Sequence, residues 1–243
     1  MDGFDPATSF DGRVAAAYDD RPRGDEDACV DWLGRRAGGG RVLELAIGTG
    51  RIGLPLARAG HDVTGIEISA DMIARLRAKD GGDALPVVRG DMADVAVNGE
   101  FDLVFVVYNT FFNLLTQDDQ VRCFENVAAH LTSEGRFVIE AVVPWDLHRL
   151  RDNQYVDAEL LTPGEARLDI ARHDPVTQIL DENHVSLTED GLTITPIVTR
   201  YAWPSELDLM ARLTGLRLVE RVGGWRDEPF DAHSRRAVSV YGR

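Results

Sequence analysis

The chain has 243 residues, of which 44% are hydrophobic and 28% charged, a composition typical of a packed globular protein and not of a disordered one. Its formal net charge is −15 and its isoelectric point is about 4.7. Because so acidic a surface repels phosphate backbones and anionic lipid heads, we expect no nucleic-acid partner and no membrane partner.

The sequence also predicts where the protein works. Its two cysteines, Cys29 and Cys123, are far apart and form no CxxC pair, which fits a reducing compartment. The N-terminal sequence MDGFDPATSF has neither a basic start nor an apolar run, so we expect no signal peptide. The longest apolar stretches, such as residues 103–107, are too short to span a bilayer. These features together predict a cytoplasmic protein.

Strands and helices alternate along the first 143 residues. The apolar runs predict strands at 41–46, 61–68, 84–90, 101–109 and 135–143. Helical spacing of apolar residues predicts helices at 26–36, 52–60, 69–79 and 118–131. Ser69 is expected to cap the third of these helices, and Gly60 to end the second. Such alternation is typical of βαβ units that form a parallel sheet with helices on both faces.

The pattern changes after Pro144. Three strands at 166–174, 177–188 and 192–203 follow one another without helices between them. A helix at 204–215 and strands at 216–224 and 235–242 then complete the chain. We therefore expect a core domain of residues 1–144 and 204–243, with residues 145–203 inserted as an antiparallel β lid. The lid is expected to lie over the ligand crevice at the carboxyl ends of the parallel strands.

A glycine-rich turn links the first predicted strand to the next helix. Residues 42–53 read VLELAIGTGRIG and contain the GxGxxG pattern, which nicotinamide- and flavin-binding folds share with methyltransferases. Gly48 and Gly50 lack a Cβ, so the backbone there is able to turn sharply and to approach a ligand closely. A tight strand-to-helix turn without any ligand is the alternative interpretation.

The acidic residues near this turn discriminate between cofactors. Glu44 is poorly placed for a diphosphate but suits an ammonium group, held directly or through water; alternatively, local backbone N–H groups satisfy it. Glu67, which ends the second strand, is suited to accept hydrogen bonds from two ribose hydroxyls, as NAD also requires. Asp91 follows the third strand and is suited to bind an adenine amine or simply to cap the next turn.

Together these segments resemble the motif series of class I S-adenosylmethionine-dependent methyltransferases. The similarity covers residues 40–143 and consists of E-L-A-x-G-T-G-R-I, G-I-E-I-S-x-x-M, G-D-M and F-D-L-V-F-V-V-Y-N-T-F, in that order. It implies a Rossmann-like, seven-stranded, mostly parallel sheet whose last strand is antiparallel, and it implies S-adenosyl-L-methionine as cofactor. The cofactor-binding residues that it implies are Tyr18, Glu44, Ala46, Gly48, Gly50, Glu67, Ile68, Met72, Asp91, Met92 and Tyr108.

The substrate-binding residues are expected near the transferred methyl group, where the fourth strand of this fold ends. Asn109, Phe112 and Asn113 follow that strand, although Asn113 would equally suit a helix cap or a turn. The segment R-Y-A-W-P-S-E-L resembles the end of the lid sheet in sugar-amine N-methyltransferases of antibiotic pathways. Further expected substrate-binding residues are therefore Trp145, Arg200, Tyr201 and Trp203. Core packing of the small sheet is the alternative role for these aromatic residues.

Catalytic residues are not assigned by these motifs, because methyl transfer from a sulfonium mainly requires alignment of the nucleophile and exclusion of water. His148, His173, His184 and His233 are titratable near neutral pH, and any one of them is a candidate general base or a surface residue. None stands at ligand spacing from another, so we expect no metal site.

The leading hypothesis is a methyltransferase that moves a methyl group to nitrogen or oxygen of a small-molecule substrate. A non-catalytic S-adenosylmethionine-binding regulator is the alternative from another class. A nicotinamide-dependent oxidoreductase is disfavoured, because Lys79 is the sole lysine and no tyrosine precedes it at the YxxxK spacing. Methylation of a macromolecule is also disfavoured, since the sequence has no basic RNA-binding patch. The resemblance makes a homodimer a reasonable expectation.

Overall fold

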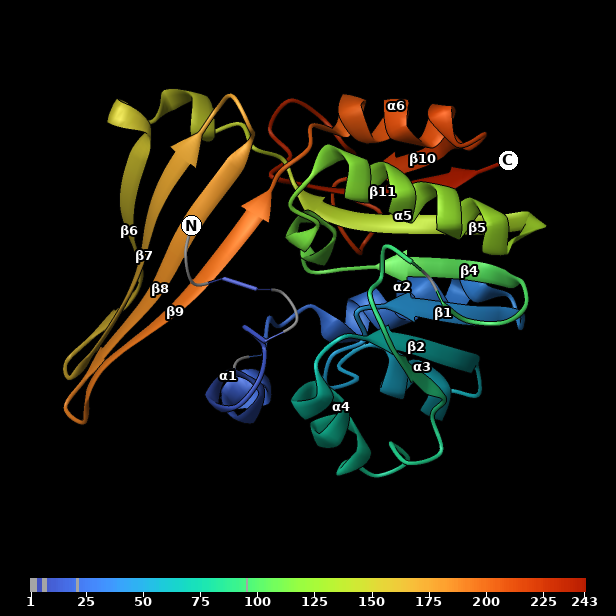
Figure 1. The fold of residues 1–243 in the computed structure, drawn as a ribbon, viewed down its shortest axis with the longest axis horizontal. Helices are drawn as coiled ribbons and strands as arrows, with labels where there is room; N and C mark the ends of the chain where they lie inside the picture. The colour runs from blue at the N-terminus through green and yellow to red at the C-terminus, as the bar shows by residue number, and fades with distance from the viewer. Residues whose placement is uncertain (1–3, 6–7, 21, 95) are drawn as a thin grey trace.

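The computed structural model describes residues 4–5, 8–20, 22–94 and 96–243, which form two separate sheets with helices around the larger one (Figure 1). Sheet A has the strand order β10-β11-β5-β4-β1-β2-β3. Its strands are β1 (Arg41–Leu45), β2 (Asp62–Glu67), β3 (Val87–Arg89), β4 (Phe101–Val106), β5 (Leu131–Val142), β10 (Arg217–Val222) and β11 (Arg236–Gly242). Only β11 runs antiparallel to its neighbours. The predicted mostly parallel sheet with an antiparallel last strand is confirmed.

Helices cover sheet A on both faces, which explains why its central strands are mostly apolar. Residues 103–106 of β4 are all buried, as a strand in the middle of a covered parallel sheet must be. One face packs against α5 and α6, and the other against α2 and α3. The helices are α1 (Arg13–Ala17), α2 (Glu26–Ala37), α3 (Gly53–Arg58), α4 (Ala70–Arg77), α5 (Gln117–His130) and α6 (Pro204–Leu213).

The helix starts follow the capping rules that the sequence suggested. The Ser69 hydroxyl accepts a hydrogen bond from the backbone N–H of Met72 at 3.1 Å, so this residue caps α4 as predicted. The Thr116 hydroxyl does the same for the N–H of Asp119 at 3.0 Å and caps α5. The structure adds α1 and the 3-10 helices η1 (Tyr18–Asp20) and η2 (Thr110–Asn113), which the periodicity did not predict.

Sheet B is an antiparallel meander with the order β6-β7-β8-β9. It comprises β6 (Gln154–Thr162), β7 (Glu165–Asp174), β8 (Ile179–Thr188) and β9 (Gly191–Arg200), and it is preceded by η3 (Leu147–Arg149) and η4 (Arg151–Asn153). The prediction of three strands was therefore wrong by one. The missed strand, β6, is an edge strand whose side chains are mostly exposed on both faces, so its sequence lacks the apolar alternation of a half-buried strand.

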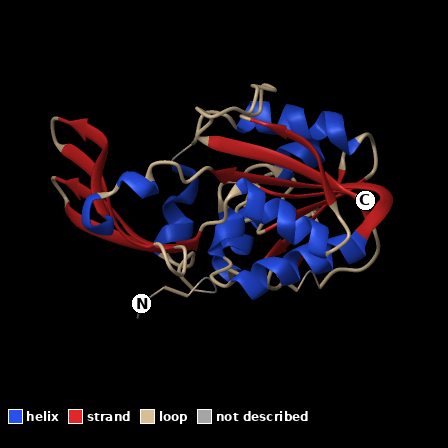
Figure 2. Ribbon diagram, turned by 90° about the horizontal axis from the view of Figure 1, so that it is seen from above, coloured by secondary structure: helices blue, strands red, loops and turns tan. Residues whose placement is uncertain are grey.

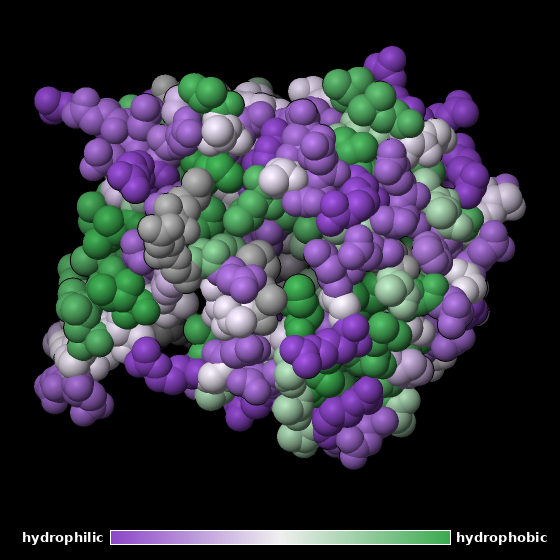
Figure 3. Space-filling view, in the orientation of Figure 1, coloured by the Kyte–Doolittle hydropathy of each residue, from purple (hydrophilic) through white to green (hydrophobic). Residues whose placement is uncertain are grey.

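The two faces of sheet B differ in chemistry. The register places Val156 opposite Ile170, and Leu187 opposite Leu192, on the same face as Ile194. These five side chains, here called the apolar face of sheet B, are between 39% and 67% exposed, and Figure 3 shows hydrophobic residues gathered over sheet B. The opposite face is polar and carries two close pairs, Tyr155 with Glu182 and Asp169 with His184, each at 2.5 Å.

Sheet B stands at the edge of sheet A where the parallel strands end (Figure 1), at one end of the molecule when it is seen from above (Figure 2). A direct contact joins the two parts, because the Asn113 side-chain amide donates to the carbonyl oxygen of Val198 in β9 at 3.3 Å. The insertion therefore borders the edge at which open parallel sheets bind their ligands.

Candidate functional site

A cavity of about 280 Å³ lies at the carboxyl edge of sheet A, close to the lower end of the range of roughly 300–1,000 Å³ for small-molecule sites. It is lined by Phe10, Tyr18, Ala46, Gly48, Glu67, Ile68, Met72, Gly90, Asp91, Met92, Thr110, Asn113, Leu114, Leu115 and Asp119. Of the predicted cofactor-binding residues, those that the fold brings together here are Tyr18, Ala46, Gly48, Glu67, Ile68, Met72, Asp91 and Met92. The other three, Glu44, Gly50 and Tyr108, are not among the described lining residues.

The glycine turn follows β1 and has a left-handed backbone. Ala46, Gly48 and Gly50 have φ values of 53°, 57° and 77°. A Cβ added to Gly48 would meet no atom within 4 Å, whereas one added to Gly50 would come within 3.0 Å of the Leu76 side chain. The φ value of Gly48 favours glycine, and the absence of a side chain leaves the space beside it open for a ligand. At Gly50, both the φ value and the close packing against Leu76 favour glycine.

Glu67 ends β2 beneath this turn and is only 5% exposed. One carboxylate oxygen accepts the backbone N–H of Gly48 and the other that of Ser69, both at 2.8 Å. Burial raises the pKa of Glu67, and these two hydrogen bonds act in the opposite direction. The carboxylate thus fixes the glycine turn and still faces the cavity.

Glu44 lies behind the turn. It is 3% exposed, and a Cβ on Gly53 would come within 2.4 Å of its Oε2. Complete burial raises the pKa of Glu44 well above its usual range, with a smaller contribution in the same direction from the neighbouring Glu67 carboxylate. Because Glu44 is absent from the described lining of the cavity, its predicted contact with the cofactor stays a prediction.

Asp91 caps a turn, which is one of the two roles that the sequence left open, and its predicted contact with the adenine amine stays a prediction. Its Oδ1 accepts the N–H of Ala93 at 2.8 Å, which caps the turn after β3. The side chain nevertheless lines the cavity together with Met92. Capping fixes the direction in which the remaining carboxylate oxygen is presented.

The segment before α2 forms another wall of the cavity. Phe10 and Tyr18 line it, and the segment is tied to the core on either side of them. Asp19 accepts a hydrogen bond from the Thr49 hydroxyl at 2.7 Å and pairs with Lys79 at 2.8 Å. The Arg51 guanidinium lies over the Tyr18 ring at 4.6 Å from its centroid. Burial raises the pKa of Tyr18, so its phenol stays protonated at neutral pH.

Of the three predicted substrate-binding residues after β4, only Asn113 reaches the cavity. Phe112 is 1% exposed and belongs to the hydrophobic core between sheet A and α5. Asn109 has its Oδ1 turned towards β5, where it accepts the N–H of Val142 at 2.6 Å. The stretch that lines the cavity is instead Thr110 with residues 113–115.

The predicted substrate-binding residues of the insertion lie at its junction with the core. Arg200 is 6% exposed and donates to Gln120 at 2.7 Å and to Glu206 at 2.8 Å. Tyr201 is 4% exposed, and its hydroxyl lies 3.0 Å from Nε2 of His173. Core packing, the alternative considered for the aromatic residues, describes the position of Tyr201.

Trp145 and Trp203 also pack at this junction. Their rings meet edge to face with centroids 5.1 Å apart. The Trp145 indole donates to the carbonyl oxygen of Ser234 at 2.9 Å. Neither indole is among the described residues that line the cavity.

No histidine is among the described residues that line the cavity. His173 is buried against Tyr201, His184 pairs with Asp169, and His233 is exposed. The side chain of His148 lies outside what the structure describes. Across residues 4–5, 8–20, 22–94 and 96–243, no cluster of three or more His, Cys, Asp or Glu side chains is arranged to hold a metal, and no helix is long and apolar enough to cross a membrane.

Several lining residues escaped the sequence reasoning. They are Phe10, Gly90, Thr110, Leu114, Leu115 and Asp119. Gly90 and Thr110 belong to the motifs G-D-M and F-D-L-V-F-V-V-Y-N-T-F, so the motifs themselves were the available signal for them. The 3-10 helix η2 turns the chain back before α5 begins, and this turn brings Leu114, Leu115 and Asp119 to the cavity. The hydrophobic periodicity of the sequence does not predict that turn.

Comparison with known proteins identifies the family. A family model described as a methyltransferase domain matches residues 42–135. The solved structure of the CcbJ methyltransferase from Streptomyces caelestis is 35% identical to this chain, covers 98% of it and 99% of its own length, and superposes with a TM-score of 0.91. The cypemycin N-terminal methyltransferase of a Streptomyces species is 29% identical over 223 residues, which are 88% of each chain.

A third relative matches a shorter part. The dTDP-3-amino-3,6-dideoxy-α-D-glucopyranose N,N-dimethyltransferase of Streptomyces fradiae is 30% identical over 148 residues, 58% of this chain and 56% of that protein. Sheet A, with its glycine turn and its cavity at the carboxyl edge, has the architecture of a Rossmann-like transferase. The chain belongs to the class I S-adenosylmethionine-dependent methyltransferases, and S-adenosylmethionine is its methyl donor.

Proposed function

We propose that this enzyme transfers the methyl group of S-adenosylmethionine to an amine nitrogen of a small molecule. The observation that carries the proposal is the convergence of separate sequence segments on one cavity. The glycine turn, the end of β2, the start of α4 and the turn after β3 all contribute to its lining. These are the segments that an adenosyl group, a ribose and an amino-acid chain would each need to contact.

The lining fits the donor residue by residue. Each Glu67 oxygen accepts one backbone N–H and keeps a lone pair for a ribose hydroxyl. Asp91 has one oxygen occupied by Ala93 and the other available for the adenine amine. Met72 and Met92 supply apolar contact to the adenine, while Ala46, Gly48 and Ile68 leave room for the ligand. Tyr18 covers the cofactor from the segment before α2.

The bound donor supplies a methyl group that is already activated by its sulfonium charge. The chain therefore has to align the acceptor with that methyl and to exclude water. Phe10, Tyr18, Leu114 and Leu115 make the cavity wall largely apolar, which serves the second requirement. Thr110 and Asn113 are the polar lining residues after β4, and we assign them to acceptor positioning.

Nitrogen is favoured over oxygen as the acceptor atom on two grounds. The cypemycin and the dTDP-amino-sugar enzymes both act, by their names, at nitrogen. The charged side chains among the described lining residues are the carboxylates of Glu67, Asp91 and Asp119, which attract a cationic amine more than an anionic acceptor. A neutral amine attacks the methyl through its lone pair, and the ammonium product then releases its proton to water, so the transfer does not depend on a strong base.

We assign residues 145–203 to a lid domain and residues 1–144 with 204–243 to the donor-binding core. Support comes from the separate hydrogen-bonded sheet that the insertion forms and from its bond to Asn113, a cavity residue. A small molecule that enters beside β9 would meet the lid and the donor at the same time. Trp145, Arg200, Tyr201 and Trp203 would then shape the acceptor site indirectly, by fixing the lid on the core.

We further propose that the enzyme is a cytoplasmic homodimer. Its two cysteines are unpaired and buried, which suits a reducing compartment. The apolar face of sheet B exposes Val156 by 67%, Leu192 by 60% and Ile194 by 52%. A second copy of the chain would remove this apolar surface from water in a two-fold arrangement.

The decisive experiment combines donor binding with acceptor screening. Calorimetry measures the binding of S-adenosylmethionine, S-adenosylhomocysteine and NAD(H) to the native enzyme and to Glu67→Ala and Asp91→Ala. Asp208→Ala, an ion-pair variant remote from the cavity, is the matched control. S-Adenosylhomocysteine release is then followed with a nucleotide-linked amino sugar, a peptide with a free N-terminus, and the hydroxyl counterpart of each.

We expect both cavity variants to bind S-adenosylmethionine at least about tenfold more weakly, while Asp208→Ala binds normally. Mass spectrometry should then find the added methyl on the amine acceptors only. Turnover of the hydroxyl compounds alone would contradict the nitrogen proposal. Binding of NAD(H) in place of the adenosyl pair would contradict the donor site itself.

A further inference from the structure

Two consecutive residues after β4 have a left-handed backbone although neither is a glycine. Tyr108 and Asn109 have φ values of 61° and 62°. Side chains disfavour this region, and a non-glycine pair persists there only where the surroundings hold it. The pair directly precedes Thr110, which begins the lining stretch at the end of β4. The path of the chain at these two residues therefore determines where that stretch stands.

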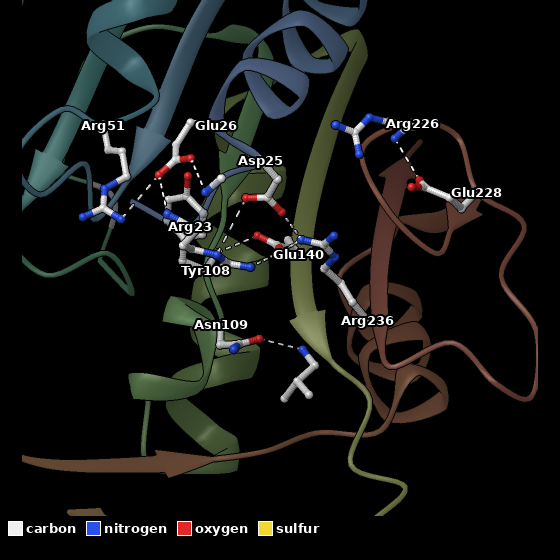
Figure 4. Close-up of polar contacts among 12 residues, drawn as sticks. Arg23, Asp25, Glu26, Arg51, Tyr108, Asn109, Glu140, Arg226, Glu228 and Arg236 are labelled. Carbon is white, nitrogen blue, oxygen red and sulfur yellow. Dashed lines mark hydrogen bonds and ion pairs between the residues drawn. The ribbon is translucent and has the colours of Figure 1, made fainter. Parts of the chain in front are cut away.

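Groups of the neighbouring strand β5 hold both residues (Figure 4). Oε2 of Glu140 accepts the backbone N–H of Tyr108 at 2.8 Å. The N–H of Val142 donates to Oδ1 of Asn109 at 2.6 Å. Since Glu140 is 1% exposed, its hydrogen bond to Tyr108 is shielded from competing water.

The same carboxylate also binds the segment before α2. Oε1 of Glu140 accepts from Arg23 at 3.1 Å and from Arg236 at 2.9 Å. The Arg23 guanidinium lies 4.2 Å from the centroid of the Tyr108 ring, a cation–π contact. In Figure 4, Arg23, Glu140 and Arg236 converge from three different parts of the chain. These two guanidinium groups, which the Asp25 carboxylate also contacts, balance the charge of the almost wholly buried Glu140.

Glu140 thus links two walls of the cavity without reaching it. One wall is the stretch after Tyr108, which ends at Asp119. The other is the segment that carries Tyr18 and leads to Arg23, and Arg51 supports it by donating to the Tyr18 carbonyl at 2.5 Å. A shift of the carboxylate would move both walls, since Oε2 accepts from Tyr108 in one and Oε1 accepts from Arg23 in the other.

We propose that Glu140 is a positioning residue for methyl transfer: its buried carboxylate holds the left-handed Tyr108–Asn109 turn and, through Arg23, the segment that closes the cavity. The motif series assigns no role to this side chain. The inference rests on the cavity being the donor site and is independent of the acceptor atom.

A double-mutant cycle tests this role. Glu140→Ala is made in the native chain and in a Tyr108→Gly chain, because glycine adopts φ near 60° without a carboxylate to hold it. Glu140→Gln keeps an acceptor for the Tyr108 N–H but loses the charge that Arg23 and Arg236 require. Asp208→Ala, which breaks the 2.5 Å pair with Arg221, is the control for the loss of an ion pair elsewhere.

Binding of S-adenosylmethionine is measured by calorimetry, and thermal unfolding is recorded for each variant. Glu140→Ala should weaken binding by about tenfold in the native chain and by less than about threefold in the Tyr108→Gly chain. Glu140→Gln should lie between Glu140→Ala and the native enzyme, and Asp208→Ala should lower the unfolding temperature without weakening binding. Such non-additivity identifies a positioning role, because a purely structural loss would be the same in both chains.

Two outcomes would overturn the inference. In the first, Glu140→Ala binds S-adenosylmethionine with an affinity within about twofold of the native enzyme. In the second, Glu140→Ala loses the same factor of affinity in the native chain and in the Tyr108→Gly chain. If Glu140→Ala does not fold, the same comparison is decided with Glu140→Gln in both chains. Failure of the native enzyme to bind S-adenosylmethionine would refute the donor site, a result distinct from either of these.

Discussion

Alanine substitutions at the two glycines of the turn after β1, Gly48 and Gly50, should lower the free energy of unfolding by different amounts. At Gly48 the added Cβ meets no atom within 4 Å, so the folding cost comes from φ of +57° alone, about 1–2 kcal/mol. At Gly50, with φ of +77°, the Cβ also stands 3.0 Å and 3.1 Å from two atoms of Leu76. Overpacking of about 1–3 kcal/mol is then added, for a total of about 2–5 kcal/mol.

The affinity for S-adenosylmethionine should fall in the reverse order, with the larger loss in Gly48→Ala. The open space beside Gly48 belongs to the cavity that it lines, so a methyl group there would occupy room that the donor needs. We expect Gly48→Ala to weaken S-adenosylmethionine binding by at least about tenfold. Its unfolding temperature should fall by only about 2–8 °C, the shift that its folding cost implies for a chain of this size.

The assay is calorimetric titration with S-adenosylmethionine alongside scanning calorimetry of Gly48→Ala, Gly50→Ala and the native chain. Gly50→Ala should be the less stable variant, and its folded fraction should bind the donor more tightly than Gly48→Ala does. Native affinity in Gly48→Ala would refute the position of the donor over this turn. Equal unfolding temperatures in the two variants would refute the packing argument.

Three further perturbations test other parts of the molecule. Because the pKa of Glu44 is raised in the folded state, the folded protein keeps this proton at pH values at which the unfolded chain has released it. The contribution of Glu44 to the free energy of unfolding therefore falls as the pH rises above about 4.5. The unfolding temperature of Glu44→Gln should therefore decrease less between pH 5 and 8 than that of the native enzyme; parallel curves would contradict this. Arg200→Leu removes the buried guanidinium that donates to Gln120 and Glu206. The free energy of unfolding in urea should fall by about 3–5 kcal/mol. A loss below about 1 kcal/mol would show that this side chain does not hold the junction. Ile194→Lys, on the apolar face of sheet B, should convert a dimer into a monomer in light scattering with unchanged donor affinity, and an unchanged mass would exclude this face as the interface.

Short-range patterns determined the core of sheet A and much of the donor site. Alternating apolar runs and helical spacing need only neighbouring residues, and the predicted strands 41–46 and 101–109 correspond to β1 and β4. Gly48, Glu67 and Asp91 could be predicted as cavity residues because each directly follows or ends a parallel strand. The carboxyl ends of such strands necessarily share one edge of the sheet, so order along the chain was enough to bring them together.

Of the residues expected to bind the acceptor, only Asn113 is among the described lining residues, because the positions of the others depend on partners distant in sequence. Arg200 was expected to contact substrate, but it pairs with Gln120, 80 residues away, where the insertion meets α5. Phe112 was expected in the reacting region, but η2 turns its ring into the core. Aromatic and charged residues are as suitable for a packed junction as for a ligand, and composition alone does not separate the two uses.

The sequence by itself therefore determined the methyltransferase core, its donor and the strand ends that line the cavity, since all of these follow from local periodicity and motif order. The tertiary structure alone revealed the four-stranded sheet B with its apolar face, the two walls of the cavity and the carboxylate that joins them. Glu140 and Arg23 are separated by 117 residues and meet only after β5 has paired with β4. Such a contact leaves no signal in the sequence around either residue, because it is the burial of Glu140 in the folded chain that makes the pairing necessary.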